Sequence, residues 1–279
     1  MKDDRIFTIT RWVVAAVIPF LLAAFVILYF FPDNTTDLFA WTISPRMTPL
    51  LMGAGYITGA YFFLQTLRSR QWHAVAVGFL PVALFATTMG ITTLLHWERF
   101  NHNHPSFFAW VFLYATTPFI VFLVWLNNRR TDPLEPDEKE VIIEKGTRRA
   151  FSLIGVAVLL LGLLLFLFPQ TFLPWWPWQL TPLTARVGGG WFMMPGLFAI
   201  LLARDRRWSS ARLALESLAL SLILLLAALP RAWDNFRFDN PFTWVFFAGA
   251  ILALVGIAVV YIRMEGRRLR SLNQFLYKA

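Results

Sequence analysis

The feature that most limits the fold is an internal repeat, which divides the chain into two similar halves. Phe31 and Trp41 recur as Phe168 and Trp178, 137 residues further along the chain. Further basic, aromatic and proline positions recur after 136 residues, namely Arg68, Arg70, Trp72, Trp97, Phe100 and Pro105 as Arg204, Arg206, Trp208, Trp233, Phe236 and Pro241. Offsets this regular predict two copies of one structural unit.

Long apolar stretches lie between these repeated positions. Hydrophobic residues make up 58% of the 279 residues and charged residues 15%, whereas about a quarter of the residues of a soluble domain are charged. Eight stretches are long enough to cross a bilayer as helices, at residues 12–31, 48–67, 73–95, 106–126, 150–168, 184–203, 211–229 and 242–262. The sequence therefore predicts an all-α integral membrane protein with eight transmembrane helices.

Each copy contains four predicted spans, so an even number of membrane crossings precedes the second copy. We therefore expect two parallel four-helix repeats of the same orientation, and not inverted repeats. Residues 1–128 form the first repeat, residues 129–149 a charged cytoplasmic linker, and residues 150–279 the second repeat with a basic C-terminal tail. Within this otherwise solvated linker, Pro136 and Asp137 predict the start of a short helix that runs to Lys145.

The basic residues are divided unevenly between the two sides of the predicted membrane. Twenty of the 25 lysines and arginines lie on the side that holds both termini. Because positive charge gathers on the cytoplasmic side, we expect a multi-pass cell-membrane protein with both termini in the cytoplasm. This topology and attraction to anionic membrane lipid account for the formal charge of +9, so no nucleic-acid partner is predicted. The first stretch ends at Phe31 and Pro32 without a small-residue cleavage site, so we interpret it as a span and not as a signal peptide.

The segments on the predicted outer side are short and rich in tryptophan and proline. Ser44-Pro45 and Thr181-Pro182 each predict an N-cap with proline in the first turn of the following helix. In one interpretation, these segments form the outer mouth of a ligand-binding cleft between the repeats. The candidate binding residues are Trp41, Arg46, Glu98, Trp178, Arg186 and Asp234.

A structural interpretation of the same charged residues competes with ligand binding. In this interpretation, Glu98 forms an ion pair with Arg46 or Arg99, and Asp234 forms one with Arg186 or Arg231. Such pairs would stabilise the fold at the membrane boundary. We favour this structural interpretation.

Three histidines lie close to Glu98 in the sequence, namely His96, His102 and His104. Imidazole and carboxylate groups are suitable ligands for zinc or copper. The second copy carries Ala232, Phe238 and Asn240 at the corresponding positions. A solvated loop is therefore favoured over a metal site, and no cofactor is predicted. The chain contains no cysteine, which excludes disulfides and thiolate ligands.

Ionisable groups are rare inside the predicted spans. Glu216 is the one acid there, and Arg212 lies one helical turn before it, which predicts an ion pair between them. Proton- or sodium-driven transport is therefore disfavoured. Small residues at helical spacing, such as Gly55 with Gly59 and Gly155 with Gly162, predict close helix packing within the chain, and secondarily a homodimer.

Three functional classes are compatible with these patterns. The first is a permease, or a protein that handles lipid or small molecules, with neutral or amphipathic cargo in a cleft between the repeats. The second is a non-catalytic membrane scaffold or accessory subunit. The third is a membrane enzyme or metal-binding protein that uses His96, Glu98, His102 and His104, and we rank it last because no sequence motif places a nucleophile beside a base. The sequence does not identify the activity.

Overall fold

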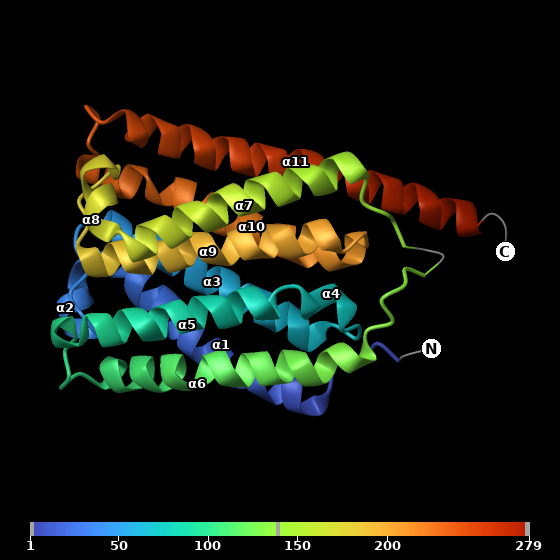
Figure 1. The fold of residues 1–279 in the computed structure, drawn as a ribbon, viewed down its shortest axis with the longest axis horizontal. Coiled ribbons are helices and arrows are strands. Elements are labelled where there is room, and N and C mark those ends of the chain that lie inside the picture. The colour runs from blue at the N-terminus through green and yellow to red at the C-terminus, as the bar shows by residue number, and fades with distance from the viewer. Residues whose placement is uncertain (1–2, 138–139, 277–279) are drawn as a thin grey trace.

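The structure is a bundle of long helices, as a computed structural model of the chain shows (Figure 1). It describes residues 3–137 and 140–276, with side chains described as far as residue 271. Eight of the described helices are long and apolar enough to span a membrane. The predicted all-α, multi-pass membrane architecture is therefore confirmed.

The eight long helices match the predicted spans to within a few residues at most of their ends. They are α1 (Thr8–Phe25, continued by a π-helical turn at Val26–Phe30), α3 (Met47–Arg68), α5 (Phe79–Leu95, preceded by the single turn α4 at His73–Ala76), α6 (Pro105–Asn128), α7 (Lys145–Leu167), α9 (Pro182–Arg204), α10 (Trp208–Ala228) and α11 (Pro241–Leu276). Short helices α2 (Thr35–Leu38) and α8 (Pro169–Phe172) lie in the connections. The largest difference is in α11, which continues well past the predicted end at residue 262.

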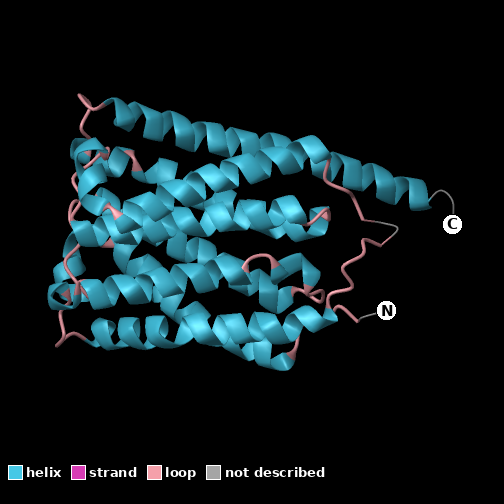
Figure 2. Cartoon of the chain, in the orientation of Figure 1, coloured by secondary structure: helices cyan, strands magenta, loops and turns pink. Residues whose placement is uncertain are grey.

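The two ends of the bundle differ in character. Both chain termini and the linker between the halves lie at one end, which we call the terminal end (Figure 1). The helices α2 and α8 lie at the opposite end (Figure 1), where short loops join the long helices (Figure 2), and we call it the aromatic end. The aromatic end is formed by residues 31–46, 96–104, 168–181 and 229–240.

The helices pair in the same way in the two halves of the chain. In the first half α1 packs on α3 and α5 on α6, and in the second half α7 packs on α9 and α10 on α11. Across the halves, α3 packs on α10 and α5 packs on α9. We call these two cross-half contacts the α3–α10 seam and the α5–α9 seam.

The crossing of α7 and α9 depends on glycine. A Cβ atom added at Gly196 would lie 2.5 Å from the backbone nitrogen of Leu159, and one added at Gly162 would lie 2.7 Å from the carbonyl oxygen of Gly189. Backbone meets backbone here, so no side-chain movement could make room. The prediction that Gly155 and Gly162 serve close helix packing is confirmed.

Backbone contacts at the terminal end recur with the offsets of the sequence repeat. The Trp72 amide donates to the carbonyl oxygen of Asp4 at 2.7 Å, and the Trp208 amide donates to that of Val141 at 2.9 Å. In each case an extended segment before the first helix of a half is held against the turn that precedes the third helix. Both indoles are fully buried by this arrangement.

Ring contacts at the aromatic end recur in the same way. Trp41 lies 5.0 Å from Phe100 between ring centroids, and Trp178 lies 5.6 Å from Phe236. Each tryptophan comes from the segment after the first helix of its half, and each phenylalanine from the segment after the third. Burying a large ring between two connections fixes the path of both.

The predicted helix from Pro136 to Lys145 is wrong. Helix α7 begins only at Lys145, and neither residues 132–137 nor residues 140–144 are helical. Ile142 instead forms an antiparallel bridge with Arg207, and the side chain of Ile143 is buried in the core of the second half. Burial of this apolar stretch outweighs the local helix signal, so this part of the linker is packed against the bundle and not solvated.

Candidate functional site

A cavity lies at the α3–α10 seam, at the terminal end of the bundle. Its volume is about 510 Å³, which falls within the usual range for small-molecule sites. Its wall is formed by the end of α3, by α4, by the linker, by the start of α10 and by α11, through Gln65, Arg68, Ser69, Gln71, Ala74, Val75, Asp137, Glu140, Val141, Trp208, Ser209, Arg212, Leu213, Glu216 and Arg268. We call it the seam cavity.

Most charged groups on the wall of the seam cavity are held by other protein groups. The Glu216 carboxylate accepts hydrogen bonds from the hydroxyl of Tyr61 at 2.9 Å and from that of Tyr261 at 2.6 Å. Arg212 Nε lies 3.1 Å from Glu216 Oε1. The predicted pair of Arg212 and Glu216 is thus confirmed. It is part of a larger cluster that joins α3, α10 and α11, so the acid is fixed in place by three helices.

Glu265 extends this cluster along α11. It accepts a hydrogen bond from the indole nitrogen of Trp208 at 2.7 Å and forms an ion pair with Arg268 at 3.1 Å. Arg68 differs from the other wall arginines. No other side or main chain in the described part of the protein forms an ion pair or hydrogen bond with its guanidinium, and the residue is exposed.

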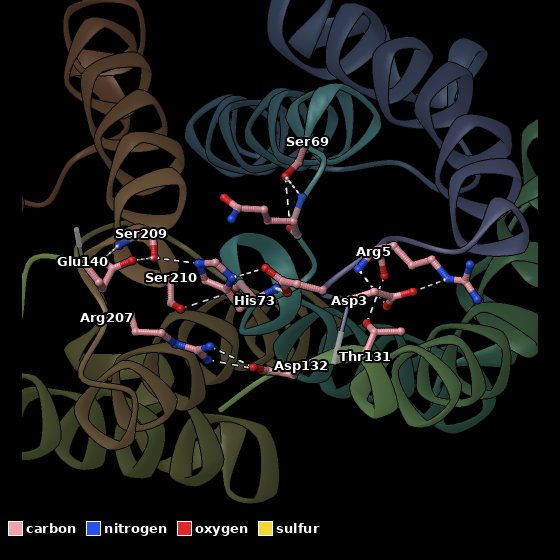
Figure 3. A network of polar contacts seen from close by, with 12 residues as sticks. Asp3, Arg5, Ser69, His73, Thr131, Asp132, Glu140, Arg207, Ser209 and Ser210 are labelled. Atoms are coloured by element: carbon pink, nitrogen blue, oxygen red, sulfur yellow. Dashed lines mark hydrogen bonds and ion pairs between the residues drawn. The ribbon is translucent and has the colours of Figure 1, made fainter. Parts of the chain in front are cut away.

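A chain of four polar side chains runs across the junction of the two halves beside the seam cavity (Figure 3). Asp4 Oδ2 lies 2.5 Å from His73 Nδ1, and His73 Nε2 lies 2.9 Å from the Ser209 hydroxyl. The Ser209 hydroxyl in turn donates to Glu140 Oε2 at 2.7 Å. His73 and Ser209 occupy equivalent positions of the two halves, 136 residues apart, so the chain joins the halves at matching points.

This row of side chains contains two similar helix caps, one in each half. The backbone amide of His73 donates to Asp4 at 3.0 Å, and the backbone amide of Ser209 donates to Glu140 at 3.0 Å. In each half an acid from the preceding segment therefore accepts hydrogen bonds at the start of a helix, where amides lack intrahelical partners. The two caps meet at the junction through the imidazole of His73.

The aspartate, histidine and serine have the order of a hydrolase triad, but the hydrogen bonds argue against that role. A nucleophilic serine donates its hydroxyl proton to histidine, whereas Ser209 has the carboxylate of Glu140 as its acceptor. The carboxylate also accepts the Ser209 amide and would repel the oxyanion of a tetrahedral intermediate. We interpret the chain as a brace between the halves.

A buried charge cluster fixes the linker next to this brace. The Arg207 guanidinium, 6% exposed, lies 2.8 Å from Asp132 of the linker (Figure 3). It also lies 2.7 Å from Asp205. Burial acts to lower the pKa of Arg207, but the hydrogen bonds and charges of the two aspartates raise it above its ordinary value. Burial likewise acts to raise the pKa of Asp205, yet the contacts with Arg207 hold it below the usual range.

The two tryptophans predicted at an outer ligand mouth are core residues. Trp41 packs against Phe39, Phe100 and Trp110 in one apolar cluster, and Trp178 lies in another. The indole nitrogen of Trp178 donates to the Thr48 hydroxyl at 2.9 Å. Both side chains are almost completely buried, so neither faces a cavity large enough for a ligand.

The predicted outer ion pairs are not formed. Arg46 pairs with Asp33 at 2.7 Å, and its pKa is raised chiefly by the hydrogen bond to Asp33, with a small contribution from Asp234. Within the described chain, Glu98 and Asp234 have no arginine within salt-bridge distance. The prediction failed because Asp33, near in sequence to Arg46, is a closer partner than the acids of distant segments.

Arg186 contacts a histidine and not an acid. Its guanidinium lies 2.8 Å from His96 Nε2 and donates to it, which requires an unprotonated ring nitrogen. Burial, and then the charges of Arg186 and Arg99, lower the pKa of His96 and so favour that neutral form.

The outer histidines do not converge. His102 Nε2 bonds the Trp97 carbonyl at 3.0 Å, while His104 bonds the Ser106 hydroxyl at 2.6 Å and the Asp37 carbonyl at 3.0 Å. Among the described residues, no group of three or more histidines and acids is placed to hold a metal ion. The structure therefore provides no support for a metal centre of His96, His102 and His104.

Sequence reasoning missed the seam cavity and the brace. Segments from both halves and the linker meet there, and none carries a motif that predicts the others. One signal was present: His73 and Ser209 follow the repeated tryptophans Trp72 and Trp208 directly, each at the start of a helix. Polar residues at matching positions of two repeats are candidates for contact across the junction.

The chain was also compared with known proteins. No family model matched it, and the searches of curated proteins and of solved structures likewise found no match. The functional argument therefore depends on the geometry of this chain alone.

Proposed function

We propose that the chain consists of two parallel four-helix repeats in the cell membrane, with both termini in the cytoplasm. The recurrence of the same contacts at offsets of 136 and 137 residues supports the duplication. The common end of both termini supports equal orientation (Figure 1). Of the 25 lysines and arginines, 20 lie in the sequence segments predicted on the side of the termini, which supports the assignment of the terminal end to the cytoplasm.

We propose further that the protein binds a small amphipathic molecule in the seam cavity, as a permease or a lipid-handling protein does. The observation that carries this proposal is the cavity itself, about 510 Å³ between the halves of a multi-pass membrane protein. Its wall combines polar groups with the apolar side chains of Val75, Val141 and Leu213. Such a wall suits a molecule with one polar and one apolar part.

The difference between the two seams supports a functional role for this cavity. The α3–α10 seam carries Tyr61, Arg212 and Glu216 near the cavity. The positions that correspond to them in the other seam are Leu197, Ala76 and Leu80. A polar cluster that the fold required would be expected in both seams. Its presence in one of them indicates that it serves a different purpose from helix packing, because polar groups are costly within a membrane bundle.

The binding site proposed here lies at a different end of the bundle from the outer mouth predicted from the sequence. The cleft still lies between the halves, but it opens at the terminal end. An accessory or scaffolding role is the competing function, and it requires no ligand in the cavity. A homodimer through small-residue helix faces and contact with membrane lipid stay predictions. Among the small residues, Gly249 and Gly256 on α11 have open space beside them.

Filling the seam cavity tests the proposal. Ala74 is half-buried on the cavity wall, so we expect Ala74→Trp to exclude the bound molecule by overlap and to lower its occupancy about tenfold or more. The measurement is native mass spectrometry of protein extracted gently with its surrounding lipid. Leu153→Trp is the matched control, because Leu153 is 74% exposed on α7 away from the cavity. A folded Ala74→Trp protein that carries the same molecule at wild-type occupancy contradicts ligand binding in the cavity.

A further inference from the structure

We propose that Arg68 holds a phosphate group of the molecule bound in the seam cavity, so that the ligand is a phosphate ester with an apolar remainder. This inference rests on the proposed function, because it assigns a chemical class to the ligand of the same cavity. The phosphate could belong to a membrane phospholipid or to a soluble phosphate ester, and the experiment below distinguishes these two sources.

The first argument is the distribution of charge on the wall. Arg212 and Arg268 are paired with Glu216 and Glu265, and Glu140 accepts hydrogen bonds from Ser209. Asp137 also has an interaction partner. Arg68 is thus the charged wall group for which the described chain provides no hydrogen bond or ion pair, so its guanidinium is available to an anionic group of a ligand.

The second argument concerns why Arg68 is free. A cation at the end of a helix ordinarily turns back to bond the last carbonyl oxygens. At the end of α3 this role belongs to Arg11 of α1, which donates to the carbonyl oxygens of Leu67 and, at 2.7 Å, of Ser69. Arg11 thereby also offsets the negative partial charge of the helix end, which would otherwise repel an anion. Arg68 is left available to a ligand.

The third argument is the number of donors near Arg68. The guanidinium presents a planar fork of N–H groups, and two residues that carry amides, Gln65 and Gln71, line the same wall. The amide of Gln65 also has a hydrogen bond with Tyr61. A carboxylate has two oxygens to satisfy, whereas a phosphate group presents more acceptor oxygens in several directions. This combination of a fork and two amides therefore matches phosphate better. Ala74, Val75 and Leu213 provide the apolar surface for the remainder of the molecule.

The repeat provides a matched control for this arginine. Arg204 is the counterpart of Arg68 at an offset of 136 residues, at the end of α9. The helix end beside it is bonded by Arg148, whose Nε donates to the Ala203 carbonyl at 2.8 Å, just as Arg11 bonds the end of α3. Arg204 is exposed but is not part of the wall of the seam cavity. The two arginines share local surroundings and differ in access to the cavity.

The test compares the wild type, Arg68→Gln and Arg204→Gln in dodecyl maltoside micelles, because this detergent contains no phosphate and so adds no competing phosphate ester. One arm adds phosphatidylglycerol to the micelles, and the other adds soluble glycerol 3-phosphate. Binding is read by native mass spectrometry and by the shift in thermal unfolding that a ligand of the folded state produces. For the probe that the wild type binds, we expect Arg68→Gln to weaken binding about tenfold or more, because charge-assisted hydrogen bonds are lost. Arg204→Gln is expected to bind as the wild type does.

Each outcome has a defined meaning. Arg68-dependent binding of phosphatidylglycerol alone supports the inference with a lipid as the source, and Arg68-dependent binding of glycerol 3-phosphate supports it with a soluble ester. Equal weakening in Arg68→Gln and Arg204→Gln overturns it, since general surface charge then accounts for binding. Failure of the wild type to bind either probe overturns it as well. If Ala74→Trp abolishes binding of the native molecule while Arg68→Gln leaves it intact, the phosphate assignment fails and the proposed function stands.

Discussion

Replacement of Arg207 by alanine is expected to lower the free energy of unfolding by about 3–5 kcal/mol, the usual cost of removing one member of a buried ion pair. Arg207 is held between Asp132 of the linker and Asp205, and its side chain is 6% exposed. Without it, two largely buried carboxylates lose their counter-charge, and the linker loses one of its several attachments to the second half. Thermal or denaturant unfolding of the purified protein in detergent measures the effect.

The adjacent Arg206 provides the control, because it is exposed and contributes only its backbone carbonyl to the bridge with the linker. Arg206→Ala should unfold like the wild type.

The pH dependence of stability gives a second readout for Arg207→Ala. Because Arg207 holds the folded pKa of Asp205 below its unfolded value of about 3.9, that contribution to stability is present above pH 4 and is lost as the pH falls through the folded pKa. Arg207→Ala should show less of this acid-dependent loss. Equal stability of Arg207→Ala and Arg206→Ala would contradict the stabilising role of the buried charge cluster.

A second large loss is expected for Gly196→Ala, at the crossing of α7 and α9. The added Cβ would lie 2.5 Å from the backbone nitrogen of Leu159, so the two helices must move apart. We expect a cost of about 3 kcal/mol, at the upper end of the usual range for overpacking, because backbone cannot repack as a side chain can. The fraction of protein that runs as a folded monodisperse species after heating measures the loss.

Gly249→Ala is the matched substitution on α11. Nothing lies within 4 Å of a Cβ atom added there. Alanine favours helix over glycine by up to about 1 kcal/mol, so this variant should be as stable as the wild type or slightly more stable. If Gly249→Ala destabilises as much as Gly196→Ala, the loss reflects glycine replacement in general and not the helix crossing.

The sequence predicted the helices well because membrane spans depend on local composition. A run of apolar residues long enough to cross a bilayer is visible without knowledge of its neighbours. The bounds of α5, from Phe79 to Leu95, and of α9, from Pro182 to Arg204, lie within a few residues of the predicted ends, apart from the turn α4 at the start of the third span. The N-cap at Thr181 was equally local and is confirmed, since its hydroxyl accepts the amide of Thr184.

Predictions failed where contacts between distant parts of the sequence determine the local structure. Ser44 was expected to cap α3 as Thr181 caps α9, but α3 begins at Met47, and its first amide donates at 3.0 Å to Asn235 from the other half of the chain. The local pattern is the same in both places, yet a side chain nearly two hundred residues away replaces the cap in one of them.

The candidate site shows the same limit more strongly. Arg46 and Glu98 were matched by charge and by their common side of the membrane, whereas the arginine bonds to Asp33. The seam cavity could not be predicted, because it arises where the ends of α3 and α4 meet the linker and α10. Such a space depends on how packed segments leave volume between them, which no spacing along the chain encodes.

The most direct test of the whole account is the side of the membrane on which repeat-equivalent residues lie. The chain has no native cysteine, so single cysteines can be placed at Arg70 and Arg206, exposed at the terminal end, and at Asn103 and Asp239, exposed at the aromatic end. Treatment of intact cells with a membrane-impermeant maleimide should label the cysteines at 103 and 239, and those at 70 and 206 only after permeabilisation. Labelling of the two members of either pair from opposite sides would contradict the parallel arrangement on which the seam cavity and its ligand depend.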